Sequence, residues 1–166
     1  MATPTNLPAS FTAATVLPAS SLNSLRGAFR ILQVVQGTTT TITANSTSTY
    51  ADTTLTATIT PQSTSSKVLV LVSHGSVFKS NANALSGVNL RLLRGGTTIS
   101  TFGAGVGYSG TLLDITSSSS VSYLDSPAVA SATTYKTQFA NNANAALVQV
   151  QVAGSMSTII LLEVSA

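Results

Sequence analysis

The sequence predicts an all-β protein, an antiparallel jelly-roll-like β-sandwich that follows an extended N-terminal arm with one short helix. Short apolar runs alternate with polar residues at a period of two, and Gly, Asn, Ser and Pro separate these runs. Serine and threonine together occupy 51 of the 166 positions, and β-branched threonine favours strands. About nine such runs without a second helical pattern are typical of a sandwich or a jelly roll.

The arm, residues 1–30, differs in pattern from the body, residues 31–166. Pro4, Pro8 and Pro18 keep the first part of the arm extended, because proline donates no backbone hydrogen bond and biases its predecessor away from helix. The extended part reaches at most ~60 Å, enough to lie across neighbouring subunits. We therefore expect two units, an anchoring arm and a β-sandwich domain.

A short amphipathic helix is expected at the end of the arm. Ser20 or Ser21 offers an N-cap, and Leu22, Leu25 and Phe29 follow at spacings of three and four. A helix of about two turns is unstable alone, so its apolar stripe needs a partner surface, on its own domain or on another subunit. The candidate attachment residues of the arm are Phe11, Leu17, Leu22, Leu25, Arg26 and Phe29.

Within the body, two strands are expected to be central in their sheets. Within residues 67–73 the five residues 68–72 are all apolar, which fits a strand buried on both faces. Residues 157–164 contain a run of Ile and Leu that would aggregate as an exposed edge. Gly95-Gly96 predicts a hairpin turn, and the glutamines of residues 147–152 should face away from the valines. The other expected strands are residues 31–36, 55–59, 88–93, 97–102, 121–124 and 134–139.

Composition argues against several classes of function. Charged residues make up 7% of the chain and the net charge is +3, but the seven cations are scattered, whereas phosphate binding needs a clustered patch. We therefore expect no nucleic-acid partner. No apolar run is long enough for a membrane span, and no secretory signal opens the chain, so we expect a soluble protein made in a cytoplasm. Without cysteine, stability must come from packing, with oligomerisation adding to it.

The titratable residues suggest no catalytic or metal site. His74 is the only histidine and is expected in a structural or surface role at a strand end. The acids Asp52, Asp114, Asp125 and Glu163 are isolated in sequence, and Asp125 precedes a Ser-Pro pair as a turn former does. Distant strands can still bring two acids together in the folded protein. A glycan-degrading enzyme therefore remains an alternative class of function. The expectation is a non-enzymatic protein without cofactor or metal.

One segment matches the glycine pattern of dinucleotide-binding proteins. Residues 105–110 read G-x-G-x-x-G, but this pattern binds a pyrophosphate only where a helix N-terminus follows it. A strand-like stretch follows here, so we interpret residues 103–120 as a long, mobile loop. Long loops on a rigid scaffold often carry recognition, and Tyr108 is the candidate contact residue.

With the strands assigned, the chain resembles modules of tail-fibre and other virion surface proteins of bacteriophages. The resemblance lies in FTAATVLPASSLNSLR (11–26), ITPQSTSSKVLVLVS (59–73), NLRLLRGGTTI (89–99), SYLDSPAVASATTYKTQFA (122–140) and STIILLEVS (157–165). The first stretch looks like the adaptor of many phage structural proteins, although Ala14 replaces its usual glycine and Pro18 its threonine.

The resemblance implies a non-enzymatic homotrimer located in the virion and synthesised in the bacterial host cytoplasm. One hypothesis is a capsid decoration (cement) protein, anchored by its arm to the major capsid protein or another virion structural protein. The alternative is a short tail fibre or fibre tip that binds a host receptor or surface glycan. Neither hypothesis involves nucleic acid or a membrane.

Overall fold

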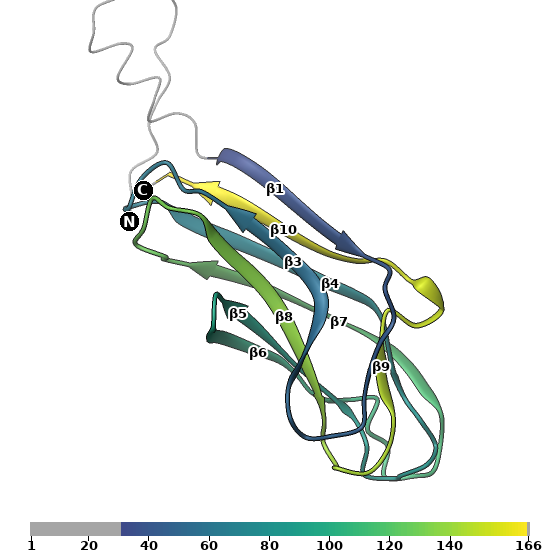
Figure 1. Ribbon diagram of the computed structural model, residues 1–166. Coiled ribbons are helices and arrows are strands. Elements are labelled where there is room, and N and C mark those ends of the chain that lie inside the picture. Colours follow the sequence, from purple (N-terminus) through teal and green to yellow (C-terminus); the bar gives the residue numbers. More distant parts are fainter. Residues whose placement is uncertain (1–30, 166) are drawn as a thin grey trace, which may run out of the picture.

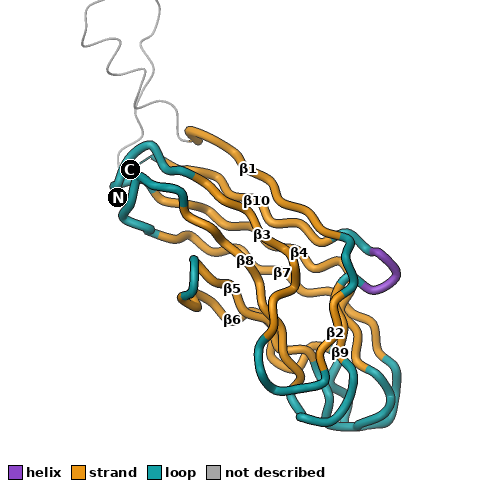
Figure 2. Tube along the Cα trace, viewed as in Figure 1, coloured by secondary structure: helices purple, strands orange, loops and turns teal. Residues whose placement is uncertain are grey.

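The computed structural model describes residues 31–165, which fold into two antiparallel β-sheets packed face to face (Figures 1 and 2). The all-β sandwich predicted from the sequence is confirmed. The predicted arm with its helix lies outside the described residues. The strands are β1 (Ile31–Thr39), β2 (Thr43–Asn45), β3 (Ala51–Ile59), β4 (Lys67–Lys79), β5 (Val88–Arg94), β6 (Thr97–Val106), β7 (Ile115–Asp125), β8 (Thr133–Asn141), β9 (Val148–Val150) and β10 (Ser157–Val164), and η1 (Val152–Gly154) is a single 3₁₀ turn.

The first sheet is organised around β4, its longest strand. Along one side β4 pairs with β7 over most of its length. Along the other side it pairs with β10 from Lys67 to His74 and then with β9 from Val77 to Lys79. β1 pairs with β10, and β2 with β9. The predictions that residues 67–73 and 157–164 form central strands are therefore confirmed.

The second sheet has the order β3-β8-β5-β6. Its β5–β6 hairpin turns at Gly95-Gly96 as predicted, and Gly95 adopts a φ of +57°, a left-handed conformation that favours glycine. When the short strands β2 and β9 are left out, β1-β10-β4-β7 faces β3-β8-β5-β6. Along the chain these are the first, eighth, third and sixth long strands opposite the second, seventh, fourth and fifth.

Alternating side chains of both sheets fill the space between them. One apolar cluster lies in the half of the sandwich near the described termini, and a second lies in the other half, with Phe102 packed against both. Removing each of these aliphatic side chains from water stabilises the fold by about 1.5–3 kcal/mol. The first cluster comprises Leu55, Ala57, Ile59, Val68, Val70, Val72, Leu92, Tyr135, Ile159 and Leu161, and the second Val77, Val88, Leu90, Phe139, Val148 and Val150.

Two expectations about the strands were wrong. Leu69 and Leu71 of β4 are only half-buried, because each sheet of an antiparallel sandwich keeps an outer face. Residues 103–120 are not one long loop, since β6 continues to Val106 and β7 begins at Ile115. The serine run before Val121 forms part of β7 because β4 supplies the pairing partners for these serines. Strand β2 was not predicted.

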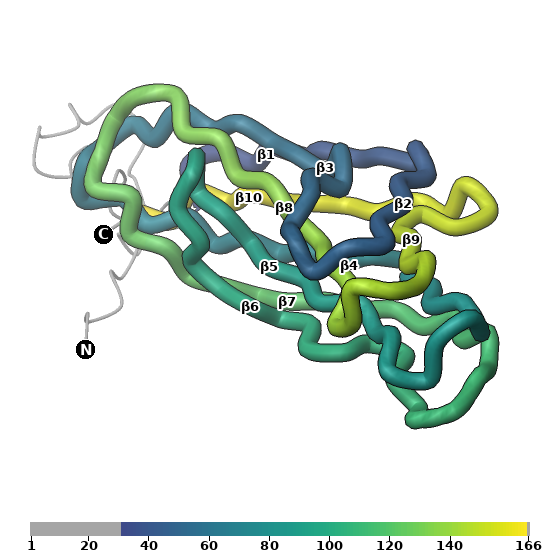
Figure 3. Tube along the Cα trace, turned by 60° about the horizontal axis from the view of Figure 1, so that its bottom comes forward, coloured from purple at the N-terminus to yellow at the C-terminus, as the bar shows by residue number. Residues whose placement is uncertain are grey.

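The sandwich has two distinct ends. We call the base the end that carries Ile31, Val164 and the loop 126–132, and the tip the end that carries the loops 80–87, 107–114 and 142–147. In Figure 1 β1 starts at the upper end, close to the C-terminus, while the tip loops lie at the bottom. Figure 3 shows the tip loops gathered beside one another.

At the base, an ion pair with a buried carboxylate ties the two sheets together. Asp125, at the end of β7, accepts hydrogen bonds from Arg94 Nη1 of β5 at 2.8 and 2.9 Å. The fully buried Tyr135 of β8 donates its hydroxyl to the same carboxylate at 2.7 Å. Burial, followed by the hydrogen bond and the charge of Asp125, raises the pKa of Tyr135. Asp125 is therefore a cross-sheet anchor, not only the turn former that the sequence suggested.

We predict that Asp125→Ala lowers the free energy of unfolding by about 2–4 kcal/mol, because it leaves the Tyr135 hydroxyl and the Arg94 guanidinium without their shared partner. The matched control is Asp52→Ala, which removes the exposed ion pair of Asp52 and Lys136 and should cost under about 1 kcal/mol. Urea unfolding of both variants measures the difference. Equal losses would contradict the anchoring role of Asp125.

Candidate functional sites

His74 lies in the interior of the sandwich, where β4 changes its partner from β10 to β9. Its ring is fully buried and stacks on Phe102, with 6.1 Å between ring centroids. Nε2 lies 3.1 Å from Thr137 Oγ1 of β8, and Nδ1 accepts from Gln151 Nε2 at 3.1 Å. The predicted position at a strand end was wrong, because β4 continues past Gly75 to Lys79.

The neighbours of His74 complete a closed polar network. Gln151 Nε2 also donates to Ser157 Oγ at 2.9 Å, and Gln151 Oε1 accepts from Thr43 Oγ1 at 3.3 Å. Thr137 Oγ1 shares a hydrogen bond with buried Thr53. A neutral imidazole with its proton on Nε2 satisfies these bonds, and burial lowers the pKa of His74 to about 4.

The expectation for Gln151 was also wrong. Its side chain is fully buried instead of facing away from the valines, because the backbone turns left-handed there, with φ of +57°. The backbone N–H of Gln151 donates to the backbone carbonyl of Ser76 at 2.9 Å. No residue pattern in the sequence signals this turn, because it depends on strand β4 being alongside.

Ser157 Oγ lies 3.2 Å from His74 Nδ1, a pairing that also occurs between a nucleophile and its base. Both residues are fully buried, so a substrate has no route to the hydroxyl. The other ring nitrogen of His74 faces the Thr137 hydroxyl in place of an orienting carboxylate. This geometry suits a structural network that joins β4, β8 and β10.

The carboxylates are held by separate sets of partners. Asp114 accepts the backbone N–H of Asn81 at the tip, at 2.6 Å. Glu163 is buried at the base, where it accepts Gln33 Nε2 at 2.6 Å and the Gln62 N–H at 2.7 Å. Burial raises the pKa of Glu163, but these bonds and those from Ser66 and Ser63 outweigh it, so its pKa lies below the ordinary value. Among residues 31–165, no group of three His, Cys, Asp or Glu residues could hold a metal ion.

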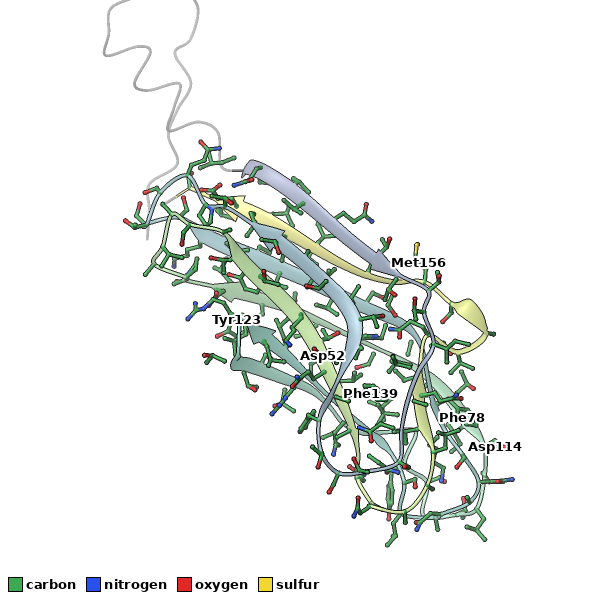
Figure 4. The ribbon with its side chains drawn as sticks, viewed as in Figure 1. Asp52, Phe78, Asp114, Tyr123, Phe139 and Met156 are labelled. Atoms are coloured by element: carbon green, nitrogen blue, oxygen red, sulfur yellow. The ribbon has the colours of Figure 1, made fainter. Side chains whose placement is uncertain are left out.

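A small pocket of about 260 Å³ opens on the outer side of the second sheet, where β3 bulges away from β8. Thr54 occupies the bulge with φ of +66°, a strained conformation for a β-branched residue. Asp52, which Figure 4 labels, borders the pocket and accepts Lys136 Nζ at 2.9 Å and Gln138 Nε2 at 2.7 Å. The volume of the pocket is somewhat below the ~300–1,000 Å³ of most ligand pockets.

The charges around the pocket are largely paired. Burial raises the pKa of Asp52, but the hydrogen bonds from Lys136 and Gln138 and the charge of Lys136 outweigh it, so its pKa lies below the ordinary value. Arg91 donates to Gln138 Oε1 through Nε and Nη2, and its guanidinium lies 3.9 Å from the centre of the Tyr50 ring. Polar side chains of β3, β8 and β5 therefore form one connected row.

The tip presents exposed apolar side chains. Tyr108, the predicted recognition residue, is 54% exposed, and the neighbouring Leu112 and Leu113 are 64% and 56% exposed. Leu85, in the adjacent loop, is 60% exposed. The sequence indicated Tyr108 but missed the three leucines, although an apolar pair between glycine-rich and serine-rich stretches was a visible signal.

Hydrogen bonds fasten the loop that carries Tyr108. Buried Lys79 donates Nζ to the carbonyl of Thr111 at 2.9 Å, and the Tyr108 N–H donates to the carbonyl of Gly105 at 2.8 Å. Gly105, Gly107 and Gly110 all have positive φ, and strand β7 follows the loop. The glycine pattern therefore forms a turn at the tip, where no helix N-terminus is present to bind a pyrophosphate.

The six candidate attachment residues, Phe11, Leu17, Leu22, Leu25, Arg26 and Phe29, lie outside the described residues. No protein-family model matches the chain, and no curated protein is significantly similar to it. Within the described residues, no helix is long and apolar enough to cross a membrane.

We predict that the protein loses about 2 kcal/mol of stability between pH 7 and pH 5 through His74 alone. The pKa of His74 is lowered on folding from 6.5 to about 4, so at pH 5 the unfolded chain binds a proton that the folded chain does not. The lowered pKa values of Asp52 and Glu163 act only near and below their ordinary values of 3.8 and 4.5. Urea unfolding at both pH values measures the loss.

The control for this prediction is His74→Gln, which keeps a hydrogen-bonding side chain but cannot titrate. No other histidine exists in the chain, so the variant should unfold with nearly the same free energy at pH 7 and pH 5. A variant that still lost about 2 kcal/mol would show that another group causes the pH dependence.

Proposed function

We propose that the protein is a non-enzymatic structural protein on the surface of a bacteriophage virion, a trimeric capsid decoration protein anchored by its N-terminal arm. The observation that carries the proposal is the strand order, β1-β10-β4-β7 facing β3-β8-β5-β6. Two interlocked Greek keys give this order in a jelly roll, an architecture common among viral capsid and lectin domains. The resemblance of the sequence to phage virion surface modules points in the same direction.

The two ends of the sandwich support an anchored orientation. The described chain begins at Ile31 and approaches its C-terminus after Val164, and both residues lie at the base. An arm that holds the base would direct the loops 80–87 and 107–114 away from the virion. The Arg94–Asp125 ion pair and the buried network of His74 join the two sheets, which suits a protein that acts as a rigid body.

We predict a copy number in the hundreds per virion for a decoration protein, because such proteins repeat with the capsid lattice. Quantitative mass spectrometry of purified virions, with the major capsid protein as internal standard, measures this number. A few tens of copies or fewer would contradict the decoration role. Deletion of residues 1–18, the proline-spaced part of the arm, should abolish binding to particles while the protein still sediments as a folded trimer.

A short tail fibre or fibre tip that binds a host receptor is the second candidate function. The exposed apolar side chains of Tyr108, Leu112 and Leu113 favour it, because aromatic and aliphatic groups at the end of a rigid scaffold provide anchors for a partner.

For this second function we predict that Tyr108→Ala combined with Leu113→Ser weakens binding of the labelled protein to host cells at least about tenfold, a loss of about 1.4 kcal/mol. The matched control is Met156→Ser, which removes an apolar side chain that is 59% exposed but lies outside the tip loops. Flow cytometry with host cells measures the binding. Equal binding by both variants would exclude the tip as the contact surface.

A further inference from the structure

The outer face of the first sheet carries a continuous apolar surface. Strand register places its side chains in rows that cross β1, β10, β4 and β7, and residues that pair directly lie about 4.5–5.5 Å apart. One row consists of Val34, Leu162, Leu69 and Leu124, and the next of Gln36, Ile160, Leu71 and Ser122. A row at the base contains Ile31, Val164 and Lys67. We call these three rows the outer apolar face.

This face is exposed at its margins and nearly free of charge. Val34 and Leu124, at its two edges, are 59% and 52% exposed, and the leucines and isoleucine between them are half-buried. Lys67, at one corner, is the only charged residue of the three rows. The strands of residues 31–165 all belong to two sheets that face each other across the core, so no third layer of strands covers this face (Figures 1 and 3). A contiguous apolar surface of this kind marks a contact site.

The described part of the chain begins at this face. Ile31 belongs to the base row and opens β1, the edge strand of the face, and 30 residues precede it. Leu22, Leu25 and Phe29 have the spacing of one side of a helix, whereas Asn23 and Ser24 would lie on the other side. A helix of about nine residues is ~13 Å long, close to the ~14 Å that separate the first and fourth strands of a sheet.

We propose that residues 20–30 cover the outer apolar face of their own chain, with Leu22, Leu25 and Phe29 packed on Leu69, Leu71 and Leu162. One residue separates Phe29 from Ile31, so the Cα atom of Phe29 lies within ~7 Å of the Cα atom of Ile31, which belongs to the face. So short a connection gives an effective concentration in the millimolar range or above, which favours the same chain over a second copy.

This inference does not rest on the proposed function. Packing of Leu22, Leu25 and Phe29 on the outer apolar face would remove apolar surface from water whatever the protein binds. It divides the arm into two parts with different roles. Leu22, Leu25 and Phe29 would belong to the folded body, while the proline-spaced part with Phe11 and Leu17 remains for attachment. Loss of virion binding and loss of this packing would therefore be separate observations.

Disulfide trapping in the full-length protein tests the packing, because the chain contains no cysteine of its own. Leu25→Cys is combined in turn with Leu69→Cys, Leu71→Cys or Leu162→Cys, so that the unknown register of the segment does not decide the outcome. A disulfide forms only where Cα atoms approach within ~7 Å. The control pair is Leu25→Cys with Thr101→Cys, an exposed position on β6 of the opposite sheet.

We expect at least one of the three pairs to form an intramolecular disulfide at least about tenfold faster than the control pair. Non-reducing electrophoresis and peptide mapping after mild oxidation measure this rate. Disulfides between chains would overturn the proposal and assign the face to a second copy. Rates no higher than the control in all three pairs would also overturn it.

Hydrogen exchange provides a second measurement that needs no cysteine. Amides of residues 20–30 should exchange at least about tenfold more slowly than the same sequence in a free peptide, since packing holds the helix closed. Leu124→Asp should remove this protection, whereas Ile42→Asp, a position 49% exposed in the loop between β1 and β2, should leave it unchanged. Free-peptide rates in the unaltered protein would refute the proposal.

Discussion

The fold depends on the satisfaction of polar groups where β4 leaves β10 and joins β9. A central strand that changes partner exposes backbone donors and acceptors in the middle of the molecule, and leaving them unpaired would cost about 1–3 kcal/mol each. Gln151 meets this need with its backbone N–H, which donates to the carbonyl of Ser76, and its side chain also donates to the buried His74 ring. The network continues through Thr137 into the second sheet, so one buried cluster fixes both the strand exchange and the alignment of the sheets.

This cluster also divides the core. Apolar side chains fill the sandwich on either side of it, toward the base and toward the tip. Each half is closed by a buried charged residue: Asp125 joins β7 to β5 and β8 at the base, and Lys79 holds the loop of Tyr108 at the tip. In a chain with 7% charged residues, such groups are kept inside because they connect elements that apolar packing alone would leave free to slide.

The sandwich has two exposed apolar surfaces, one at the tip and one on the outer side of the first sheet. Hydroxyl side chains cover much of the exposed surface, and eight of the eleven exposed large apolar side chains of the described residues lie on the tip loops or on the outer apolar face. The first surface lies at the far end from Ile31, and the second begins beside it. A protein held by its arm would therefore use one surface to complete its own fold and present the other to the surroundings.

The fold class, the Gly95-Gly96 hairpin and the central position of residues 67–73 and 157–164 could be predicted from the residue pattern, because period-two patterning and turn residues are local properties. It also indicated Tyr108, since glycines mark a loop wherever they interrupt strands. The folded arrangement was needed to show that His74, Gln151 and Ser157 share one network, that the serines before Val121 form a strand, and that Asp125 joins the sheets. Those outcomes depend on partners 6 to 83 residues away in the chain that only the fold brings together, which local patterning does not encode.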